Sequence, residues 1–406
     1  MFRSSLTLIA VATAWSCGAG SPASDVVRET LPNGAVVVRH LSLPATDDSG
    51  TEVAVAEVDL KLGVMDGDPN FIFGDIRGIE AASDGTIYVL DYQAVEVRAY
   101  LPDGQYLETI VRSGEGPGEI REANGIFLEA DSLLWINDHG KMAIIGVTPQ
   151  GEEIARFPFP VRRYGYIWDG VFDHQGRFWM GTSHSDEERT FPPETGLVTG
   201  TSRGYYKSYD IATEATDSVY TGEDTYRSFI AETGGGYSYR GIPFEASTPT
   251  IVDPSGGFWK ANTAEYRITR TAENGDTLLV IEAALPVRPV TAEDRAAYVD
   301  AAVERDPDDR RAAEEVAALM PEVKPILSGL FVDDEGRLWV RRVVENDGPA
   351  FYDLFSGDGD HLGSLRLGFD AGQYATLWVR HGNIYTWVED ELDVPYVVRA
   401  PIPRIP

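Results

Sequence analysis

One short pattern recurs along this chain and constrains its fold more than any other feature. Apolar residues lead into a polar turn, usually with Gly, and the turn is followed by an apolar residue and then an aromatic one, as in SDGTIY at residues 83–88. Gly supplies the positive φ of a tight turn and the aromatic ring packs on the pleated face behind it, so each copy predicts a β-hairpin. The six copies end at Tyr88, Trp135, Trp179, Trp259, Trp339 and Tyr385.

A second turn follows the first at a fixed distance. Gly104, Gly151 and Gly275 each lie 16 residues after an aromatic residue of the pattern. The six aromatic residues themselves are 47, 44, 80, 80 and 46 residues apart. Two hairpins in a unit of about 45 residues make four strands per repeat, which is typical of a β-propeller blade. The two intervals of 80 residues predict blades that carry insertions.

The end of the chain indicates how the ring closes. The second turn of the sixth unit falls at Pro401, and the sequence stops five residues later, so this blade lacks its outer strand. The alternating apolar run at residues 53–63 precedes the first blade. We expect it to pair with residues 397–400, because pairing removes an exposed sheet edge. The sequence therefore predicts an all-β, six-bladed β-propeller over residues 51–406, closed by an N-terminal strand.

Two segments carry a family resemblance. LETIVRSGEGPGEI at residues 107–120 and GIEAASDGTIYVLD at residues 78–91 resemble the six-bladed propellers of the NHL type. Propellers with such a GxGPGE loop are common among bacterial exported lipoproteins. The resemblance implies the fold and leaves the chemistry open, because such propellers include binding scaffolds, lyases and lactonases.

The N-terminus is typical of an exported protein. Residues 1–16 hold one early Arg3 and an apolar run that suits a signal peptide and is too short to span a bilayer. Cys17 follows directly, and its surroundings resemble a bacterial lipobox, which implies lipidation of this Cys in the cell envelope, at the periplasmic side or in the outer membrane. The alternative is ordinary cleavage after Ala14. Residues 17–50 are expected to form a tether and one strand.

Composition excludes several classes of function. The 406 residues contain 34 Lys and Arg against 65 Asp and Glu, a formal net charge of −31. This charge repels phosphate backbones, so we expect no nucleic-acid partner. A single Cys excludes a disulfide framework and thiolate-clustered metal sites. We expect a monomer that meets the membrane only through a lipid anchor.

The insertions fall in loops that share one face of the disc. Strands in a blade are antiparallel, so the loops alternate between the two faces of the disc. The insertions near residues 184–202 and 223–247, and a helical hairpin at about 291–321 that begins with a capping box at Thr291, all belong to the same face. We expect this face to bind the ligand or partner.

Polar residues at the strand ends converge on the mouth of the central channel on that face. They enter or leave the inner strands of successive blades, so the ring brings them together. The candidates are Arg77, Asp91, Asn124, Asp138, His139, Asp169, His184, Arg240, Asn262 and Arg342.

A second, partial resemblance suggests a metal. Asn124-Gly125 and Asp169-Gly170 look like elements of gluconolactonase-type (SMP-30-like) propellers, in which an Asn and an Asp help to hold a divalent cation that polarises a lactone carbonyl. The resemblance implies Ca²⁺ or another divalent cation on Asn124 and Asp169. Ser328 stands where the family has a Glu ligand, however, and Arg77 where it has an Asn. The alternative is that Asn124 and Asp169 hold loop amides.

The arginines also allow two interpretations. Arg77, Arg240 and Arg342 can form a mouth that binds a carboxylate or phosphate, or they can form salt bridges to Asp91 and Asp138. The GEGPGE loop at residues 114–119 has no following helix, which favours a turn between blades over a phosphate cradle.

Two hypotheses follow. The first is an exported propeller that binds a small molecule, a glycan or an envelope protein without catalysis. The second is a metal-dependent hydrolase or lyase of the lactonase kind, with Asn124 and Asp169 as ligands and Arg77 or His139 as an acid–base or orienting group.

Overall fold

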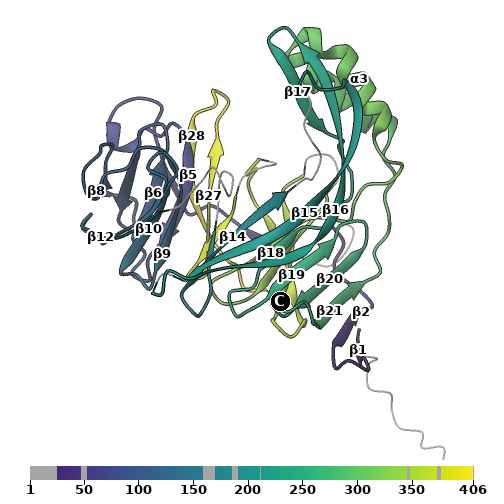
Figure 1. Ribbon diagram of the computed structural model, residues 1–406, viewed down its shortest axis with the longest axis horizontal. Coiled ribbons are helices and arrows are strands. Elements are labelled where there is room, and N and C mark those ends of the chain that lie inside the picture. The colour runs from purple at the N-terminus through teal and green to yellow at the C-terminus, as the bar shows by residue number, and fades with distance from the viewer. Residues whose placement is uncertain are drawn as a thin grey trace, which may run out of the picture.

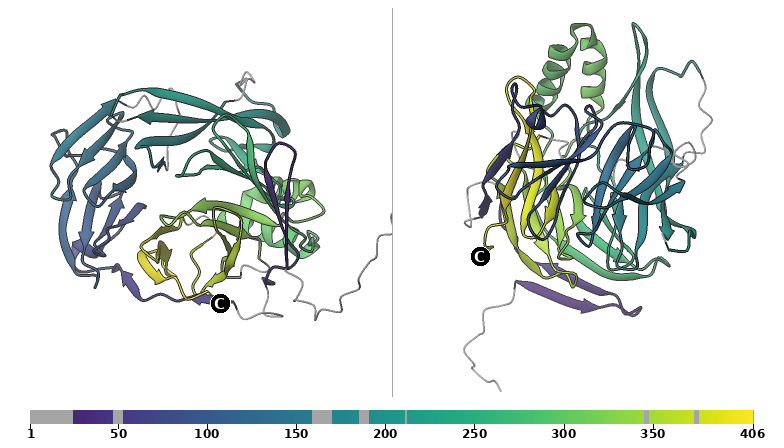
Figure 2. Two further views of the ribbon diagram at one scale, coloured as in Figure 1. Left: turned by 90° about the horizontal axis from the view of Figure 1, so that it is seen from below. Right: turned by 90° about the vertical axis from the view of Figure 1, so that its left-hand side faces the viewer.

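Six β-sheets follow one another around a ring, as the left-hand view of Figure 2 shows. The computed structural model describes residues 25–46, 53–158, 170–184, 191–210, 212–344, 348–372 and 376–405. The predicted signal peptide, Cys17 and Asp169 lie outside the described residues. The six-bladed propeller predicted from the repeat is confirmed.

The first two blades are plain four-stranded meanders. Both consist of four consecutive antiparallel strands, and the other blades are compared with them below. Blade one consists of β5 (Ile76–Ala81), β6 (Ile87–Asp91), β7 (Glu96–Tyr100) and β8 (Tyr106–Val111), and blade two of β9 (Ala123–Glu129), β10 (Leu133–Asp138), β11 (Ala143–Val147) and β12 (Glu153–Pro158).

Blades three and four depart from this standard in their outer parts. Blade three has long outer strands and a fifth strand, and blade four gains two strands from the N-terminus. Blade three consists of β13 (Val171–Phe172), β14 (Arg177–His184), β15 (Gly196–Asp210), β16 (Thr216–Thr233) and β17 (Gly236–Gly241), and blade four of β18 (Thr250–Val252), β19 (Phe258–Asn262), β20 (Tyr266–Thr271) and β21 (Thr277–Ala283), extended by β2 (Val36–His40) and β1 (Val26–Thr30).

Blades five and six complete the ring. In blade six Val397 pairs with Leu62, so the predicted closure of the ring by an N-terminal strand is confirmed. Blade five consists of β22 (Leu327–Val332), β23 (Leu338–Arg342), β24 (Phe351–Phe355) and β25 (His361–Leu367) with β3 (Ala54–Ala56) at its edge, and blade six of β26 (Trp378–Arg380), β27 (Asn383–Glu389), β28 (Pro395–Pro401) and β4 (Leu60–Leu62).

The N-terminal hairpin is part of the propeller, which the sequence did not indicate. Strand β2 pairs in parallel with β21, with Val38 opposite Ile281, and β1 folds back on β2. Val38 is fully buried in the core that blades four and five share. Residues 17–50 therefore include a sheet extension that covers the outer edge of blade four, which limits edge-to-edge aggregation.

The recurring turn has a physical cause that explains its fixed spacing. In blade five the Asp333 carboxylate accepts hydrogen bonds from the Trp339 indole at 2.7 Å and from the backbone amide and guanidinium of Arg337. Asp173 does the same for Trp179 and Arg177 in blade three. In these two blades a buried carboxylate thus ties the turn to the aromatic residue six positions later.

The three insertions build a single lobe, here called the insertion lobe, which consists of the outer part of β15–β16, β17 and the helices α2 (Ala292–Arg305) and α3 (Arg310–Leu319). In Figure 1 the helices and β17 rise together on one side of the ring. Phe229 and Ile242 pack against Val299 and Val316 of the helices. Thr291 caps α2 through the predicted box. Much of the insertions predicted near residues 184–202 and 223–247 is strand rather than loop.

Candidate functional site

Three of the polar residues predicted at the inner-strand entries share one local geometry. The β-ladder shifts register at Arg77, Asn124 and Ser328, each directly before a Gly. A bulge of this kind re-aims one side chain, and bulges are frequent next to binding sites. The propeller thus presents a different side chain at the equivalent point of blades one, two and five.

Arg77 and Asn124 lie in contact across the first two blades. Arg77 Nη1 donates to Asn124 Oδ1 at 2.6 Å, and its Nη2 donates to Asp75 at 2.8 Å. The guanidinium also lies over the Tyr92 ring, 3.2 Å from its centroid. Arg77 is therefore bound by Asp75, Asn124 and Tyr92, and the acidic side chain that it pairs with here is Asp75.

Asn124 does not suit a metal ion in this geometry. Its side chain is 1% exposed, and its only amide oxygen already accepts from the Arg77 guanidinium. A cation so close opposes the binding of a second cation. The nitrogen Nδ2 has no hydrogen-bond partner among the described atoms, and a nitrogen donor does not ligate Ca²⁺. No three His, Cys, Asp or Glu side chains in the described part of the chain come close enough to hold a metal ion.

Asp91 and Asp138 hold loops together below the mouth. Each is at most 1% exposed. Asp91 accepts hydrogen bonds from the backbone amides of residues 74, 75, 93 and 94, and Asp138 from those of residues 121, 122 and 141. Each carboxylate therefore joins the loop that enters its blade to the turn after the second strand.

Of the remaining mouth residues, His139 lies beside the Arg77 group, because both contact the Tyr92 ring. His139 Nε2 lies 3.0 Å from a Glu122 carboxylate oxygen, and its ring stacks on Tyr92 with centroids 6.3 Å apart. Asn262 accepts from a backbone amide of its own turn. His184 ends β14, where its backbone pairs with Arg203.

Arg240 belongs to the insertion lobe. Its two terminal nitrogens donate to the two carboxylate oxygens of Asp309, at 2.6 and 2.5 Å. Both side chains are 18% exposed. This bidentate pair joins β17 to the start of α3, so Arg240 stabilises the packing of the ribbon against the helices.

Arg342 lies in a cleft at the root of the helical insertion, here called the cationic cleft. Its volume is about 460 Å³. The segments that precede α2 and follow α3 form one side, and the loop after β23 forms another. The cleft is lined by residues 43–46, 285–286, 288, 324–326, 342, 344, 348–349 and 366.

Four cationic side chains line this cleft, Arg288, Lys324, Arg342 and Arg366, and no acidic residue is among the described lining residues. Three of them donate to backbone carbonyls: Arg342 to Pro44 at 2.6 Å, Arg366 to Thr46 at 2.9 Å, and Arg288 to Val343. These contacts help to hold the three guanidiniums in place. Lys324 pairs with Asp294 of α2 at 2.6 Å.

A buried network supports Arg342 from inside the blade. Its guanidinium lies 3.7 Å from the carboxylate of Asp353, which is fully buried. Asp353 also accepts hydrogen bonds from Tyr266 at 2.8 Å and Ser364 at 2.5 Å. Burial, and then the nearby Asp353 carboxylate, raise the pKa of the Tyr266 hydroxyl well above its usual value, so this hydroxyl stays protonated and donates.

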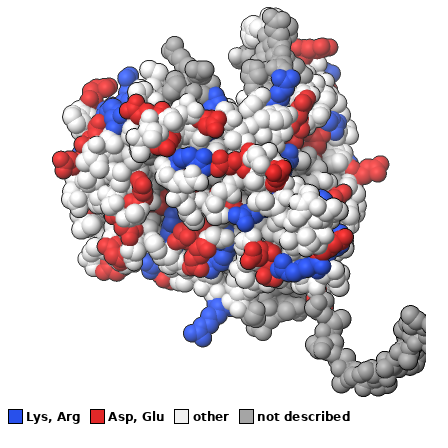
Figure 3. Space-filling model, turned by 60° about the horizontal axis from the view of Figure 1, so that its bottom comes forward, with Lys and Arg blue, Asp and Glu red and all other residues white. Residues whose placement is uncertain are grey.

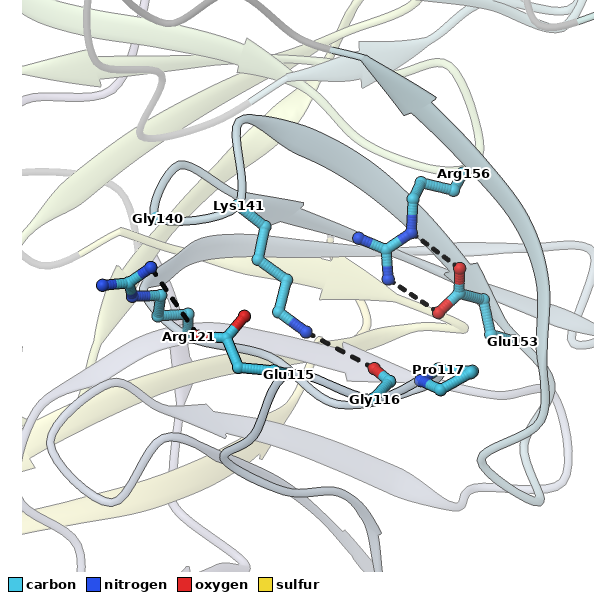
Figure 4. A pocket seen from close by; sticks show the side chains of 8 residues that line it. All are labelled: Glu115, Gly116, Pro117, Arg121, Gly140, Lys141, Glu153 and Arg156. Atoms are coloured by element: carbon cyan, nitrogen blue, oxygen red, sulfur yellow. Dashed lines mark hydrogen bonds and ion pairs between the residues drawn. The ribbon is translucent and has the colours of Figure 1, made fainter.

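A second pocket, here called the glycine-loop pocket, lies between blades one and two and has a volume of about 400 Å³. Figure 4 shows its cationic side chains turned onto its own acceptors. Arg156 forms two hydrogen bonds to Glu153, both of 2.8 Å, and Arg121 lies 3.7 Å from Glu115. Lys141 donates to the carbonyl of Glu119 at 2.9 Å.

The loop amides of this pocket are also occupied. The Gly116 amide donates to the Glu119 carboxylate and the Gly118 amide to the Glu153 carboxylate, both at 2.6 Å. The hydrogen bond from Arg156, together with that from the Gly118 amide, holds the pKa of Glu153 below its usual value against the effect of burial. The loop at residues 114–119 therefore binds carboxylates of its own chain.

Acidic and basic side chains are interspersed on the face seen in Figure 3. In the described part of the chain, no helix is both long and apolar enough to cross a membrane.

Comparison with known proteins supports the propeller fold and assigns no function. No protein-family model matches the chain, and no curated protein does. A solved structure of a member of the DUF4221 family from Bacteroides vulgatus matches 86% of this chain and 98% of its own, with 10% identity and a TM-score of 0.50. At this identity the likeness supports the propeller fold alone.

Two solved propellers of known name are similar at lower scores. Virginiamycin B lyase from Staphylococcus aureus covers 84% of this chain and 98% of its own, at 10% identity and a TM-score of 0.40. Regucalcin, a calcium-binding protein from Agrobacterium tumefaciens, covers 87% and 99%, at 12% identity and a TM-score of 0.37. We draw no argument from either.

Sequence reasoning found one of the four cations of the cationic cleft. Arg342 follows the second strand of a blade, so its place at the mouth could be counted from the repeat. Arg288 and Lys324 flank the helical insertion, and Arg366 lies in an outer strand. Arg288 and Lys324 could have been found by one signal only. The chain is strongly acidic, yet a cationic residue stands on each side of this insertion.

Proposed function

We propose that this protein is an exported β-propeller that binds a small organic molecule in the cationic cleft without transforming it. The observation that carries the proposal is the cleft itself: about 460 Å³, at the root of the insertion lobe, lined by apolar and cationic side chains. Binding sites for small molecules are typically of this size and mix apolar walls with a few fixed polar groups.

Export is part of the proposal and rests on the N-terminal sequence. Arg3 and the short apolar run suit a signal peptide, and Cys17 suits lipid attachment in the cell envelope. A ligand-binding propeller on a lipid anchor is the form in which a monomer would present its cleft to the periplasm or to the cell exterior. A glycan or an envelope protein at the same face is the competing kind of partner.

The alternative of a metal-dependent lactonase has no comparable support. It requires the oxygen of Asn124 as a ligand, and that oxygen accepts a hydrogen bond from Arg77. Since Asn124 does not fit the cation and Asp169 lies outside the described residues, we derive no reaction step through a metal ion.

Blocking the cleft tests the proposal. Ala45 lines the cleft and is exposed, so Ala45→Trp is expected to fill it without disturbing the core. The matched control is Ala212→Trp in the exposed outer turn of blade three. A library of neutral, cationic and anionic compounds is screened by thermal shift. We expect compounds that stabilise the wild type and A212W and leave A45W unchanged. Finding none, or finding that all bind A45W equally well, would overturn the proposal.

A further inference from the structure

The charge of the cationic cleft is opposite to that of the molecule. The chain has a net charge of −31, yet the described lining of this cleft contains three arginines, one lysine and no acidic residue. Arginine presents a planar fork of donors that matches carboxylate and phosphate oxygens. Arg288, Arg342 and Arg366 come from three different segments and meet only in the fold, so the cleft is a product of tertiary structure.

Arg342 retains a donor that the protein does not use. The residue is 6% exposed, and its Nε–H has no hydrogen-bond partner in the described structure, although Nη1 donates to Pro44. A buried donor without an acceptor costs free energy. An acceptor oxygen brought by a ligand would remove that cost, which gives the site a reason to prefer an anion.

The other part of the lining is apolar. Leu43, Leu285 and Ile326 line the cleft, and four prolines contribute rigid apolar surface: Pro44, Pro286, Pro325 and Pro349. An inorganic anion would leave this surface in contact with water. A ligand that fills the cleft therefore needs an apolar body as well as an anionic group.

We propose that the ligand is an amphipathic organic anion, with a carboxylate or phosphate head bound by Arg288, Arg342 and Arg366 and an apolar body packed on the leucine and proline wall. This inference rests on the proposed function and narrows it. Both head groups share the chemistry that arginine recognises, so the experiment distinguishes them.

A matched series of ligands separates charge from apolar surface. Decanoate, decyl phosphate, decanol and decylammonium share one alkyl chain and differ in the head group, while acetate and inorganic phosphate carry the charge without the chain. Calorimetry should show decanoate or decyl phosphate binding at least about tenfold more tightly than decanol. Acetate, inorganic phosphate and decylammonium should bind far more weakly. The tighter of the two anions identifies the head group.

Variants then locate the head group. Arg288→Gln and Arg366→Gln should each weaken the binding of the anion by about tenfold or more and leave decanol unchanged. Arg311→Gln is the matched control, because it removes the same charge from a side chain on α3 that is 92% exposed. We expect R311Q to bind as the wild type does.

The two proposals fail in different ways. Neutral ligands that bind in the cleft as tightly as the anions, or anion binding that R288Q and R366Q leave intact, would overturn this inference and keep the cleft as a binding site. Ligands that bind equally well to A45W would overturn the proposed function as well. Folding of each variant is checked by its thermal transition in the absence of ligand.

Discussion

The glycine-loop pocket and the cationic cleft have similar volumes, about 400 and about 460 Å³, and both contain arginine and lysine side chains. In the first, Glu153 and Glu119 accept from the loop amides, and Glu153 also accepts from Arg156. In the second, three guanidiniums are held by backbone carbonyls. The first pocket has carboxylates among its own lining residues, whereas the described lining of the second has none.

The difference arises from where the residues stand in the chain. The glycine-loop pocket is assembled from one blade-to-blade loop and its neighbouring blade, within residues 115–156. The cationic cleft joins residues 43–46 to residues 324–326 and Arg366. Local elements can satisfy one another's charges. The cleft depends on a long-range arrangement, and the carboxylates that pair with Lys324 and Arg342, those of Asp294 and Asp353, are not among its described lining residues.

The largest expected effect concerns the support of Arg342. Asp353→Asn removes the carboxylate that faces Arg342 and leaves that guanidinium buried beside a neutral amide. Breaking a buried pair in this way typically costs about 3–5 kcal/mol, so we expect a loss of about 3 kcal/mol in the free energy of unfolding. Denaturant unfolding measures it. Glu153→Gln in the glycine-loop pocket is the comparison and should cost about 1 kcal/mol. Equal losses of unfolding free energy in D353N and E153Q would contradict the expected difference between the cationic cleft and the glycine-loop pocket.

Charge reversal in each pocket separates their roles in binding. Arg366→Glu should weaken the binding of decanoate by about a hundredfold, because it replaces an attraction in the cleft with a repulsion. Arg156→Glu makes the same change of net charge in the glycine-loop pocket and should leave the affinity as it is. Calorimetry on both variants tests this. A comparable loss in R156E would mean that overall charge, rather than the cleft, controls binding.

The glycine-loop pocket should bind an external anion once its own carboxylates are removed. The double variant Glu119→Ala, Glu153→Ala removes the acceptors of the Gly116 and Gly118 amides and the ion-pair partner of Arg156. We expect this variant to bind sulfate with a dissociation constant on the order of millimolar, since backbone amides and a guanidinium form an anion site. Thermal shift with sulfate against chloride at equal ionic strength measures it. An equal thermal shift of the wild type with sulfate would mean that Glu119 and Glu153 do not keep anions out of this pocket.

The smallest effect is a dependence on pH. The hydrogen bond from Arg156 depresses the pKa of Glu153, so the stability that this carboxylate contributes is present above its unfolded value and is lost as pH falls through the lower folded value. The difference in unfolding free energy between the wild type and E153Q should therefore be constant near neutral pH and shrink in acid. A difference in unfolding free energy that grows in acid would contradict a lowered pKa of Glu153 in the folded protein.

Much of the fold could be predicted because its signals are local. The offset from the turn to the aromatic residue comes from a carboxylate such as Asp333, which reaches Trp339 within one hairpin. The capping box at Thr291 lies within one helical turn. The closing pair of Val397 with Leu62 is distant in the chain, but the blade count demanded it.

The candidate site was less predictable because its contacts are not local. The repeat predicted the correct strand ends for Arg77, Asn124 and Arg342. The position in a strand does not determine, however, which residue a side chain contacts. Arg77 takes Asn124 and Arg342 takes Asp353. The N-terminal hairpin that brings residues 43–46 to the cleft pairs in parallel with β21, and nothing in either segment alone indicates that partner.

The most direct test locates a bound ligand. A crystal structure of the protein grown with 10-bromodecanoate shows the bromine by its anomalous scattering. We predict one bromine peak in the cationic cleft beside the leucine and proline wall, with the carboxylate at Arg288, Arg342 and Arg366. A peak in the glycine-loop pocket, or a carboxylate turned to solvent with no arginine contact, would contradict the account.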